Sequence, residues 1–176
     1  RNVKVVGLNH EALKSYLQSR GIDLSIGECE CKEIHYTCNK KEYFAVAFPN
    51  VAGGYEIRNP YFKGCIAPKD ISIIRKPDRL GVRCCCLFEG FMDYLSYLTL
   101  VKSGRITEGS ESVDYIVLNS VSNIGRAIEP IKKYKVIHCY LDNDDAGRRV
   151  VDSLHELLGD KVQDMFAPYP LYKDLN

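Results

Sequence analysis

The strongest constraint on the fold is a repeated alternation of short apolar runs and amphipathic stretches between residues 82 and 167. The apolar runs predict strands at 82–88, 115–119, 135–141 and 161–167. The stretches between them predict helices at 91–101, within 122–134 and at 145–158. Because strands that alternate with helices form a mostly parallel sheet with helices on both faces, we expect an α/β domain over 81–176. Ligands of such domains gather at the carboxyl ends of the strands.

The last of these helices has one apolar side. Its apolar residues recur at helical spacing and predict a single buried stripe of Val150, Val151, Leu154, Leu157 and Leu158. Gly159 is the expected end of the helix, since glycine readily adopts the left-handed conformation that closes many helices.

The chain before residue 81 predicts a small α+β domain, 1–80. A first helix is expected, with Asn9 as its N-cap, Gly21 just past its end and a buried stripe of Leu13, Tyr16 and Leu17. Strands are expected at 33–38, 42–48 and 55–58, the last two joined in a hairpin by a loop with Asn50, Gly53 and Gly54. Residues 60–80 lack strong periodicity, so we place a linker and a domain boundary near 77–82.

Composition places the chain among ordinary globular proteins, with 176 residues that are 45% hydrophobic and 27% charged. It has no run of about 18 apolar residues, the length that spans a membrane, so no membrane partner is expected. It begins at Arg1 without an initiator Met or a signal-peptide pattern. We therefore expect a cytoplasmic protein and an excerpt of a longer chain.

Eight cysteines could suggest a disulfide scaffold. However, Cys84, Cys85 and Cys86 are consecutive in an apolar run, and adjacent strand residues point to opposite faces, so they cannot readily crosslink. Reduced thiols in a cytoplasmic core are expected instead. Another set has zinc-ligand chemistry but lacks the paired spacing of structural zinc sites: Cys29, Cys31, His35 and Cys38. We expect a half-buried strand there, and no zinc.

Charge is unevenly distributed along the chain. Residues 1–83 hold 14 Lys and Arg against 9 Asp and Glu, a net +5, and residues 84–176 hold 10 against 14, a net −4. A basic part beside an acidic part suits an enzyme that grips a polyanion with one and binds metal with the other.

Acidic residues follow two of the predicted strands. Glu89 follows the first, with Gly90 permitting a tight turn and Asp93 one helical turn later, and Asp142 and Asp144 follow the third. Clustered carboxylates repel one another and raise one another's pKa unless a cation offsets the repulsion. Mg²⁺ prefers one or two carboxylate oxygens together with water and phosphate oxygens. The arrangement predicts a Mg²⁺ site completed by phosphate, suited to phosphoryl transfer.

The alternative for any single acid is a structural role. Asp144 or Asp145 could cap a helix N-terminus, where carboxylates accept hydrogen bonds from unpaired amides. Capping does not explain why acids follow two strands of one sheet. Gly147, in the first turn of a helix, indicates that something approaches closely there, because glycine costs about 1 kcal/mol against alanine.

At these residues the chain resembles the Toprim domain of bacterial-type primases, topoisomerases and several nucleases. The match lies at Glu89-Gly90-Phe91-Met92-Asp93 and at Asp142-Asn143-Asp144-Asp145-Ala146-Gly147-Arg148, the latter similar to the primase form. More loosely, 16–22 and 48–58 resemble the opening and the basic subdomain of primase polymerase domains. Residues 172–176 are similar to a Lys-Asp-x-Asn tail in primase-like proteins of phages and mobile elements.

The resemblance implies a Rossmann-like Toprim fold preceded by a small basic α+β subdomain. It implies that Glu89 acts as general acid/base or metal partner, that Asp142 and Asp144 bind Mg²⁺, with Mn²⁺ as a possible substitute, and that Asp93 supports them. Expected contacts to template or nucleotide phosphates come from Arg58, Lys63, Arg83 and Lys173. The aromatic residues near them, Tyr55, Tyr61 and Phe62, either stack on unpaired bases or pack in the core and the hairpin. The zinc-binding module that precedes such cores is absent from this sequence, so template recognition is expected to lie outside it.

Three functions fit these features. The leading hypothesis is a DNA primase that synthesises RNA primers on single-stranded DNA from nucleoside triphosphates, with a replicative helicase as an expected partner. The second is strand cleavage by the same metal site, as in Toprim nucleases and topoisomerases, although none of the twelve tyrosines stands out as a nucleophile. The third is a non-catalytic module that binds DNA or a helicase.

Overall fold

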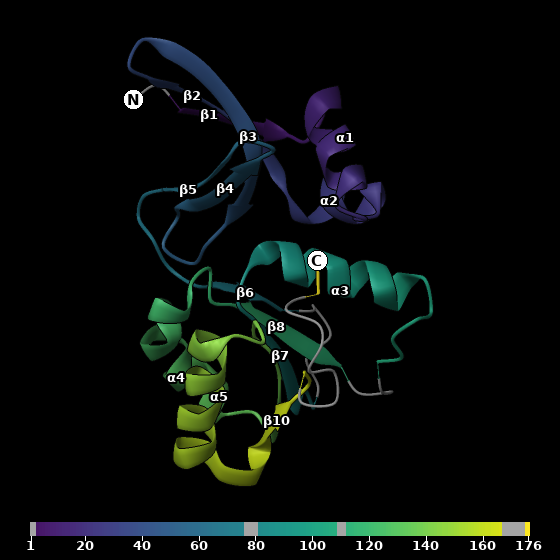
Figure 1. Cartoon of the computed structure of the whole chain (residues 1–176), viewed down its shortest axis with the longest axis vertical. Helices are drawn as coiled ribbons and strands as arrows, with labels where there is room; N and C mark the ends of the chain where they lie inside the picture. The colour runs from purple at the N-terminus through teal and green to yellow at the C-terminus, as the bar shows by residue number, and fades with distance from the viewer. Residues whose placement is uncertain (1–2, 76–80, 109–111, 167–174) are drawn as a thin grey trace. The chain divides into compact units, whose positions relative to one another are not determined.

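The computed structural model describes residues 3–75, 81–108, 112–166 and 175–176. The chain divides into two compact units, residues 1–69 and 70–176 (Figure 1). Each unit has its own sheet.

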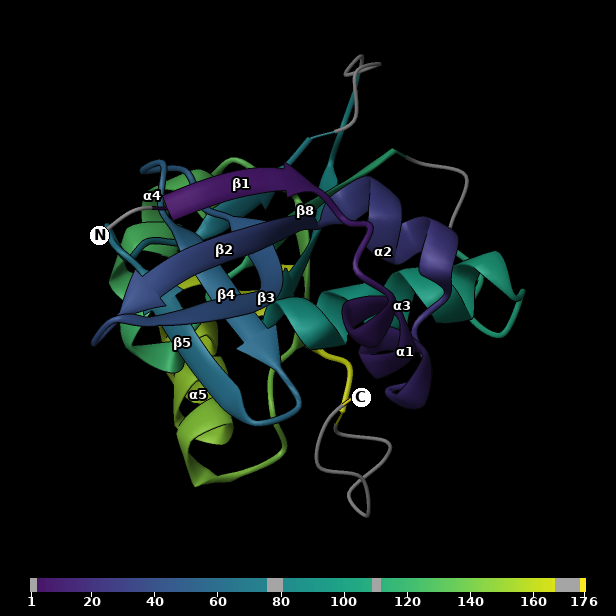
Figure 2. The same ribbon diagram turned by 90° about the horizontal axis from the view of Figure 1, so that it is seen from above.

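The first unit contains one antiparallel sheet whose strands are neighbours in chain order (Figure 2). Two helices, α1 (Glu11–Ser19) and α2 (Leu24–Glu30), lie between the first two strands in sequence. The strands are β1 (Val3–Gly7), β2 (Lys32–Cys38), β3 (Lys41–Pro49), β4 (Tyr55–Asn59) and β5 (Phe62–Ile66). The predicted strands at 33–38, 42–48 and 55–58 and the β3–β4 hairpin are confirmed, whereas β1, α2 and β5 were not predicted.

Helix α1 buries Leu13, Tyr16 and Leu17, as its spacing predicts. The predicted N-cap at Asn9 is wrong, because His10 caps the helix by accepting a hydrogen bond from the backbone N–H of Ala12 at 3.2 Å. Asn9 instead donates its backbone N–H to the carboxylate of Glu33 at 3.0 Å. The backbone N–H of His10 reaches the same Glu33 oxygen at 2.7 Å, which ties the entry of α1 to β2.

The two faces of the first sheet differ. The His10 ring stacks on Phe44 with centroids 4.1 Å apart, so the face that carries Phe44, Val46 and Phe48 lies against α1. Because side chains alternate along a strand, the opposite face carries a second set, and it forms a separate apolar cluster of Ile34, Ala45, Ala47 and Ile57.

The second unit contains a sheet in the order β10-β9-β7-β8-β6. Its four strands after β6 (Ser72–Ile74) are β7 (Cys84–Phe88), β8 (Val113–Val117), β9 (Val136–Tyr140) and β10 (Val162–Asp164). The helices are α3 (Phe91–Lys102), α4 (Ile124–Lys132) and α5 (Asp145–Leu158). All strand pairs are parallel except β6 with β8, so the predicted mostly parallel sheet is confirmed. Its predicted helices and its strands at 82–88, 115–119 and 135–141 are present, whereas the strand predicted at 161–167 is shorter, Val162–Asp164, and residue 167 lies outside the described residues.

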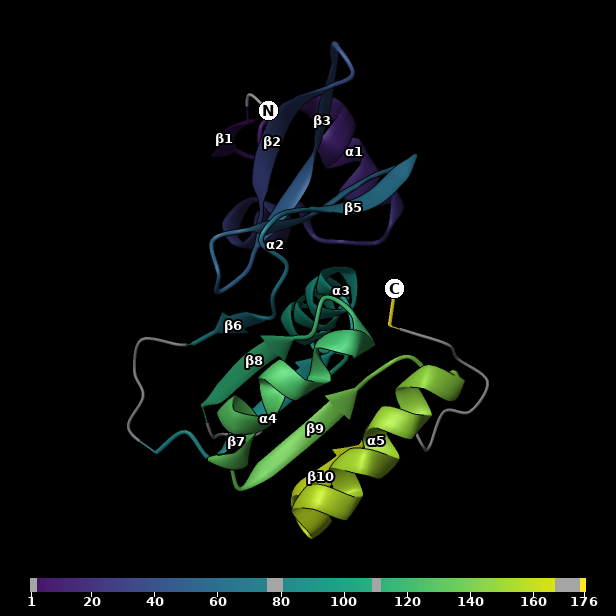
Figure 3. The same cartoon turned by 90° about the vertical axis from the view of Figure 1, so that its left-hand side faces the viewer.

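Helices cover both faces of this sheet (Figure 3). On one face, Cys85 and Leu87 of β7 pack in one cluster with Ala127 of α4 and Val151 of α5. On the other face, the Phe88 ring contacts the rings of Tyr94 and Tyr97 of α3. Leu157 was expected in the buried stripe of α5, but its side chain is 54% exposed, so that part of the prediction is wrong.

The division between the units falls earlier than the predicted boundary at residues 80 and 81. Strand β6 pairs with β8 through Ile73 and Ile116, which places residues 72–74 in the second unit. Residues 76–80, on which the predicted boundary falls, lie outside the described residues.

No disulfide joins any of the eight cysteines, all of which the structure describes. Burial raises the pKa of the Cys139 thiol to about 12, and it likewise raises the pKa of Cys85 and Cys86, so these core thiols stay protonated. In the described part of the chain, no helix is both long enough and apolar enough to cross a membrane.

Candidate active site

The candidate site lies where three parallel strands end side by side. Phe88, the last residue of β7, pairs with Val117 of β8 on one side and with Tyr140 of β9 on the other. The residues that follow these strands therefore leave the sheet at the same edge. Two of the three segments carry the predicted acids, and the third carries an asparagine.

Glu89 and Asp142 come together at this edge. The Glu89 carboxylate accepts a hydrogen bond from the backbone N–H of Asp142 at 3.4 Å, between residues that are 53 positions apart in sequence. Both residues are half-buried. The expectation that acids from two separated stretches meet in space holds for this pair.

Asp93 lies close to Glu89, in the first turn of α3, whose N-cap is Gly90. A Cβ added at Gly90 would lie 3.1 Å from Oδ2 of Asp93, so the Asp93 carboxylate lies directly over the turn that follows Glu89. The turn is tight because glycine leaves that space open.

Asp144 caps helix α5. Its Oδ1 accepts hydrogen bonds from the backbone N–H groups of Ala146 and Gly147 at 3.0 and 3.1 Å, which is the structural role weighed as an alternative. The carboxylate also opposes the positive end of the helix dipole.

Gly147 explains how the loop and the helix fit together. A Cβ added at Gly147 would lie 2.0 Å from the Asp142 carbonyl oxygen, a distance that no side chain tolerates. The first turn of α5 therefore packs directly on the backbone of Asp142. The close contact that a glycine predicts at this position is therefore a contact with the backbone of Asp142, a residue of the candidate site.

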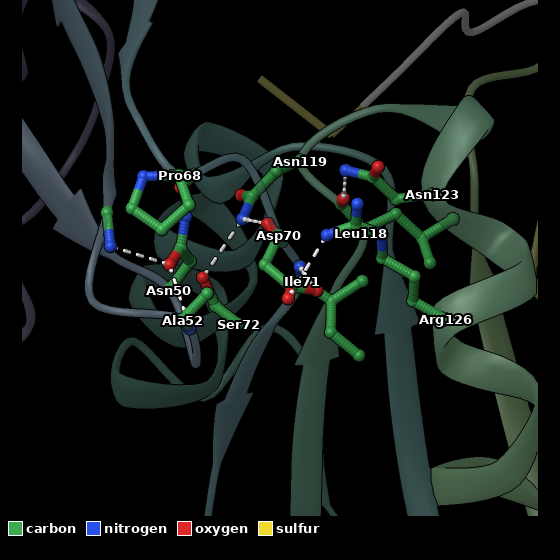
Figure 4. A network of polar contacts seen from close by, with 11 residues as sticks. Asn50, Ala52, Pro68, Asp70, Ile71, Ser72, Leu118, Asn119, Asn123 and Arg126 are labelled. Carbon is green, nitrogen blue, oxygen red and sulfur yellow. Dashed lines mark hydrogen bonds and ion pairs between the residues drawn. The ribbon is translucent and has the colours of Figure 1, made fainter.

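Two further polar residues of the second unit were not identified from the sequence. Asn119 follows β8 with a left-handed backbone, φ 63°, and donates its side-chain amide to the Asp70 carbonyl at 2.9 Å and to the Ser72 hydroxyl at 3.0 Å (Figure 4). Asn123 donates to the Leu118 carbonyl at 2.9 Å. These bonds fix the end of β8, and the only signal for them in the sequence is an asparagine just after an apolar strand, a residue that tolerates positive φ.

Other contacts drawn in Figure 4 brace turns within each unit. In the second unit, Arg126 forms an ion pair with Asp70 at 3.1 Å. In the first unit, the Asn50 side chain donates to the Pro68 carbonyl at 2.8 Å and accepts from the backbone N–H of Ala52 at 3.0 Å, which closes the β3–β4 turn.

The donor set is that of a hard divalent cation, since carboxylate oxygens predominate at this edge. Across residues 3–75, 81–108, 112–166 and 175–176, no three His, Cys, Asp or Glu side chains are grouped closely enough to hold a metal ion by themselves. Mg²⁺ does not require three, because it keeps several waters and shares its remaining positions with substrate phosphates. Glu89 and Asp142 therefore fit a Mg²⁺ site that substrate completes.

The predicted phosphate contacts are divided between the two units. Arg58 and Lys63 are cross-strand partners on β4 and β5 of the first unit, with Lys63 exposed. Arg83 is exposed just before β7, at the opposite end of that strand from Glu89, and its carbonyl accepts a hydrogen bond from the backbone N–H of Lys135 at 2.7 Å. Lys173 lies outside the described residues.

The residues weighed as zinc ligands are dispersed. Cys31 is buried, Cys29 is exposed, and Cys38 lies at the end of β2. His35 is engaged by the Glu33 carboxylate at 2.6 Å. The two backbone N–H groups of Asn9 and His10, and the His35 ring, hold the pKa of Glu33 below its usual value, against the effect of its burial.

A family model described as Toprim-like matches residues 86–176, just over half of the chain. The chain belongs to the Toprim-like family. Within this Toprim-like protein, residues 2–67 match the model of a domain of unknown function (DUF8464). No curated protein sequence matches the chain significantly.

Solved primase structures share the fold. The match to the primase fragment of the bacteriophage T7 primase-helicase covers 99% of this chain and 69% of that fragment, with a TM-score of 0.62 and 18% identity. The match to the zinc-binding and RNA polymerase domains of the Aquifex aeolicus primase covers 88% of this chain and 49% of that one, with a TM-score of 0.57 and 18% identity. The match to T7 primase domains bound to an RNA/DNA hybrid and dTTP covers 92% of this chain and 79% of that one, with a TM-score of 0.56 and 15% identity. The predicted Toprim fold, preceded by a small subdomain, is confirmed.

Proposed function

We propose that this Toprim-like protein is the catalytic core of a Mg²⁺-dependent DNA primase that synthesises RNA primers on single-stranded DNA. The observation that carries the proposal is the Glu89 carboxylate lying 3.4 Å from the backbone nitrogen of Asp142 at the carboxyl edge of the sheet. The likeness in fold to primases from a phage and a bacterium supports it. Single-stranded DNA, nucleoside triphosphates and a replicative helicase are the proposed partners.

In primer synthesis, a ribonucleotide 3′-hydroxyl attacks the α-phosphate of an incoming triphosphate and pyrophosphate leaves. When bound, Mg²⁺ neutralises the phosphate charge that develops, and Mn²⁺ supplies similar chemistry. Glu89 is half-buried at the end of a rigid strand, so it is well placed to take the hydroxyl proton or to hold the cation. Asp142 would hold the cation from the loop that follows the neighbouring strand.

Asp93 and Asp144 support Glu89 and Asp142 in different ways. Asp93 adds negative charge over the Gly90 turn and thereby strengthens attraction for a cation. Asp144 holds the first turn of α5, which packs on the Asp142 backbone. We assign Asp144 a positioning role through that cap, with its charge as a secondary contribution.

The test is a primer-synthesis assay with single-stranded DNA, labelled nucleoside triphosphates and Mg²⁺ or Mn²⁺. Glu89→Gln is expected to lower the rate about 10²- to 10⁴-fold, the usual contribution of a positioned acid or base. Asp142→Asn is expected to raise the Mg²⁺ concentration for half-maximal synthesis about 10- to 100-fold. Asp152→Asn and Glu156→Gln make the same chemical changes at exposed positions of α5 and are expected to leave synthesis unchanged.

The products separate the proposal from its competitors. Metal-dependent oligoribonucleotides support priming if Glu89→Gln lowers the rate of their synthesis and Asp142→Asn raises its Mg²⁺ requirement. Shortened DNA strands in place of oligoribonucleotides would show that the same site cleaves strands. Binding of DNA without any product, from the full-length protein, would identify a non-catalytic module.

A further inference from the structure

The first unit contains a cavity of about 510 Å³ on the sheet face opposite α1. Its volume is within the ~300–1,000 Å³ of small-ligand sites. Four of its lining residues are aromatic, namely Tyr36, Tyr43, Tyr61 and Phe62. None of the described residues that line it is charged. Tyr55 packs against the apolar cluster of this face.

The aromatic rings present flat faces to the cavity. Tyr36 and Tyr43 are cross-strand partners on β2 and β3, and their rings stack with centroids 5.5 Å apart and an angle of 19°. Phe62 is 49% exposed and Tyr43 is 40% exposed. Large aromatic surfaces exposed together mark a binding surface, because water solvates them poorly.

Tyr61 is the most exposed of these rings, at 95%. It lies in the turn between β4 and β5, where its backbone N–H donates to the Asn59 side chain at 2.9 Å. Asn59 in turn donates to the Phe44 carbonyl at 3.1 Å. The turn is therefore held by hydrogen bonds of its backbone, and the Tyr61 ring contributes little to the folded core.

The charges near the cavity favour an anionic ligand. Lys41 pairs with Cys38, a lining residue, and directly opposed residues project from the same face of a sheet, so Lys41 projects from the cavity face. Lys40 occupies the adjoining turn with φ 63°. The nearest acid in sequence, Glu42, pairs with Thr37 and projects from the other face by strand alternation.

We propose that this cavity binds unpaired bases of a single-stranded nucleic acid, with Tyr61 and Tyr43 stacking on the bases and Lys41 contacting the backbone phosphate. Flat rings with hydroxyl groups beside a lysine match the chemistry of a base joined to a phosphate. An apolar peptide would use the rings but not the lysine. The inference deepens the proposed function, on which it rests for the class of ligand, by giving the template a binding site in the first unit.

The test is fluorescence anisotropy of a labelled oligo(dT) with the full chain, without metal. Tyr61→Ala is expected to weaken binding roughly 5- to 150-fold, the range for loss of one stacking side chain. Tyr61→Phe keeps the ring and is expected to bind like the unaltered protein. Lys41→Gln is expected to weaken binding and to reduce the slope of log affinity against log salt by about 0.7, the value for one phosphate of a single strand.

Leu157→Ala is the matched control, because it also truncates an exposed apolar side chain, but in the second unit. Thermal unfolding of Tyr61→Ala should match that of the unaltered protein, since the ring is almost wholly exposed. Unchanged oligo(dT) affinity in Tyr61→Ala overturns the inference, and so does equal competition by dTMP alone, which would indicate a mononucleotide site. The two proposals fail separately: Tyr61-dependent binding without primer synthesis refutes only the priming activity, and primer synthesis with Tyr61-independent binding refutes only the cavity.

Discussion

Gly147 is the single residue that most directly sets the position of Asp142. Gly147→Ala is expected to destabilise the protein by about 1–3 kcal/mol, because the new Cβ would overlap the Asp142 carbonyl oxygen and the helix would have to shift. That outweighs the ~1 kcal/mol that alanine contributes to a helix. Chemical denaturation measures the free energy of unfolding. Gly125→Ala, in α4 with no atom near its added Cβ, is the control and should be neutral or stabilising. Equal effects at the two positions would contradict the packing argument.

For single residues, the sequence predicts which side chains form the candidate site better than it predicts their hydrogen bonds. Glu89 and Asp142 could be paired from the sequence, because two acids after parallel strands must leave the sheet at one edge. The capping bonds of Asp144 were weighed correctly as an alternative. The contacts of Asn119 could not be predicted, because Asp70 and Ser72 lie more than 45 positions away and Ser72 belongs to a strand that was not predicted.

Helix α5 allows the two roles of Asp144 to be separated. Asp144→Ala removes the N-cap and is expected to cost about 1 kcal/mol, or a fall in Tm of about 2–4 °C for a chain of this size. Asp144→Asn keeps a capping oxygen but removes the charge, so its Tm should stay close to that of the unaltered protein. If Asp144 acts by positioning, Asn should also retain most of the primer synthesis. A stable Asn variant with activity as low as Asp142→Asn would show that the charge itself is needed.

The elements that the sequence predicts are those with strong periodicity and full burial. Strands β7 and β8 are buried throughout and were predicted. Strand β1 is mostly exposed and α2 buries only Gly27, so neither has an apolar pattern that distinguishes it from a loop. Strand β6 has three residues and is defined by its pairing with β8, which is a long-range contact.

The whole molecule has two compact units with different charge. With the division after Lys69, the first unit has 10 basic and 7 acidic residues, a net +3, and the second has 14 and 16, a net −2. The asymmetry is smaller than the sequence suggested for a boundary after residue 83, but its direction is the same. The aromatic cavity and Lys41 are in the basic unit, and Glu89 and Asp142 are in the acidic one.

This division predicts how the chain behaves when it is cut. Residues 70–176 produced alone should unfold cooperatively on heating, because the complete sheet β10-β9-β7-β8-β6 and the apolar cluster beneath α4 and α5 lie within them. The same fragment should bind oligo(dT) at least tenfold more weakly than the full chain, since one lost stacking contact alone is worth about that much. Circular dichroism follows the first property and anisotropy the second. If the fragment folds and binds oligo(dT) with the affinity of the full chain, the single-stranded DNA binds to the second unit and the first unit has no part in template binding.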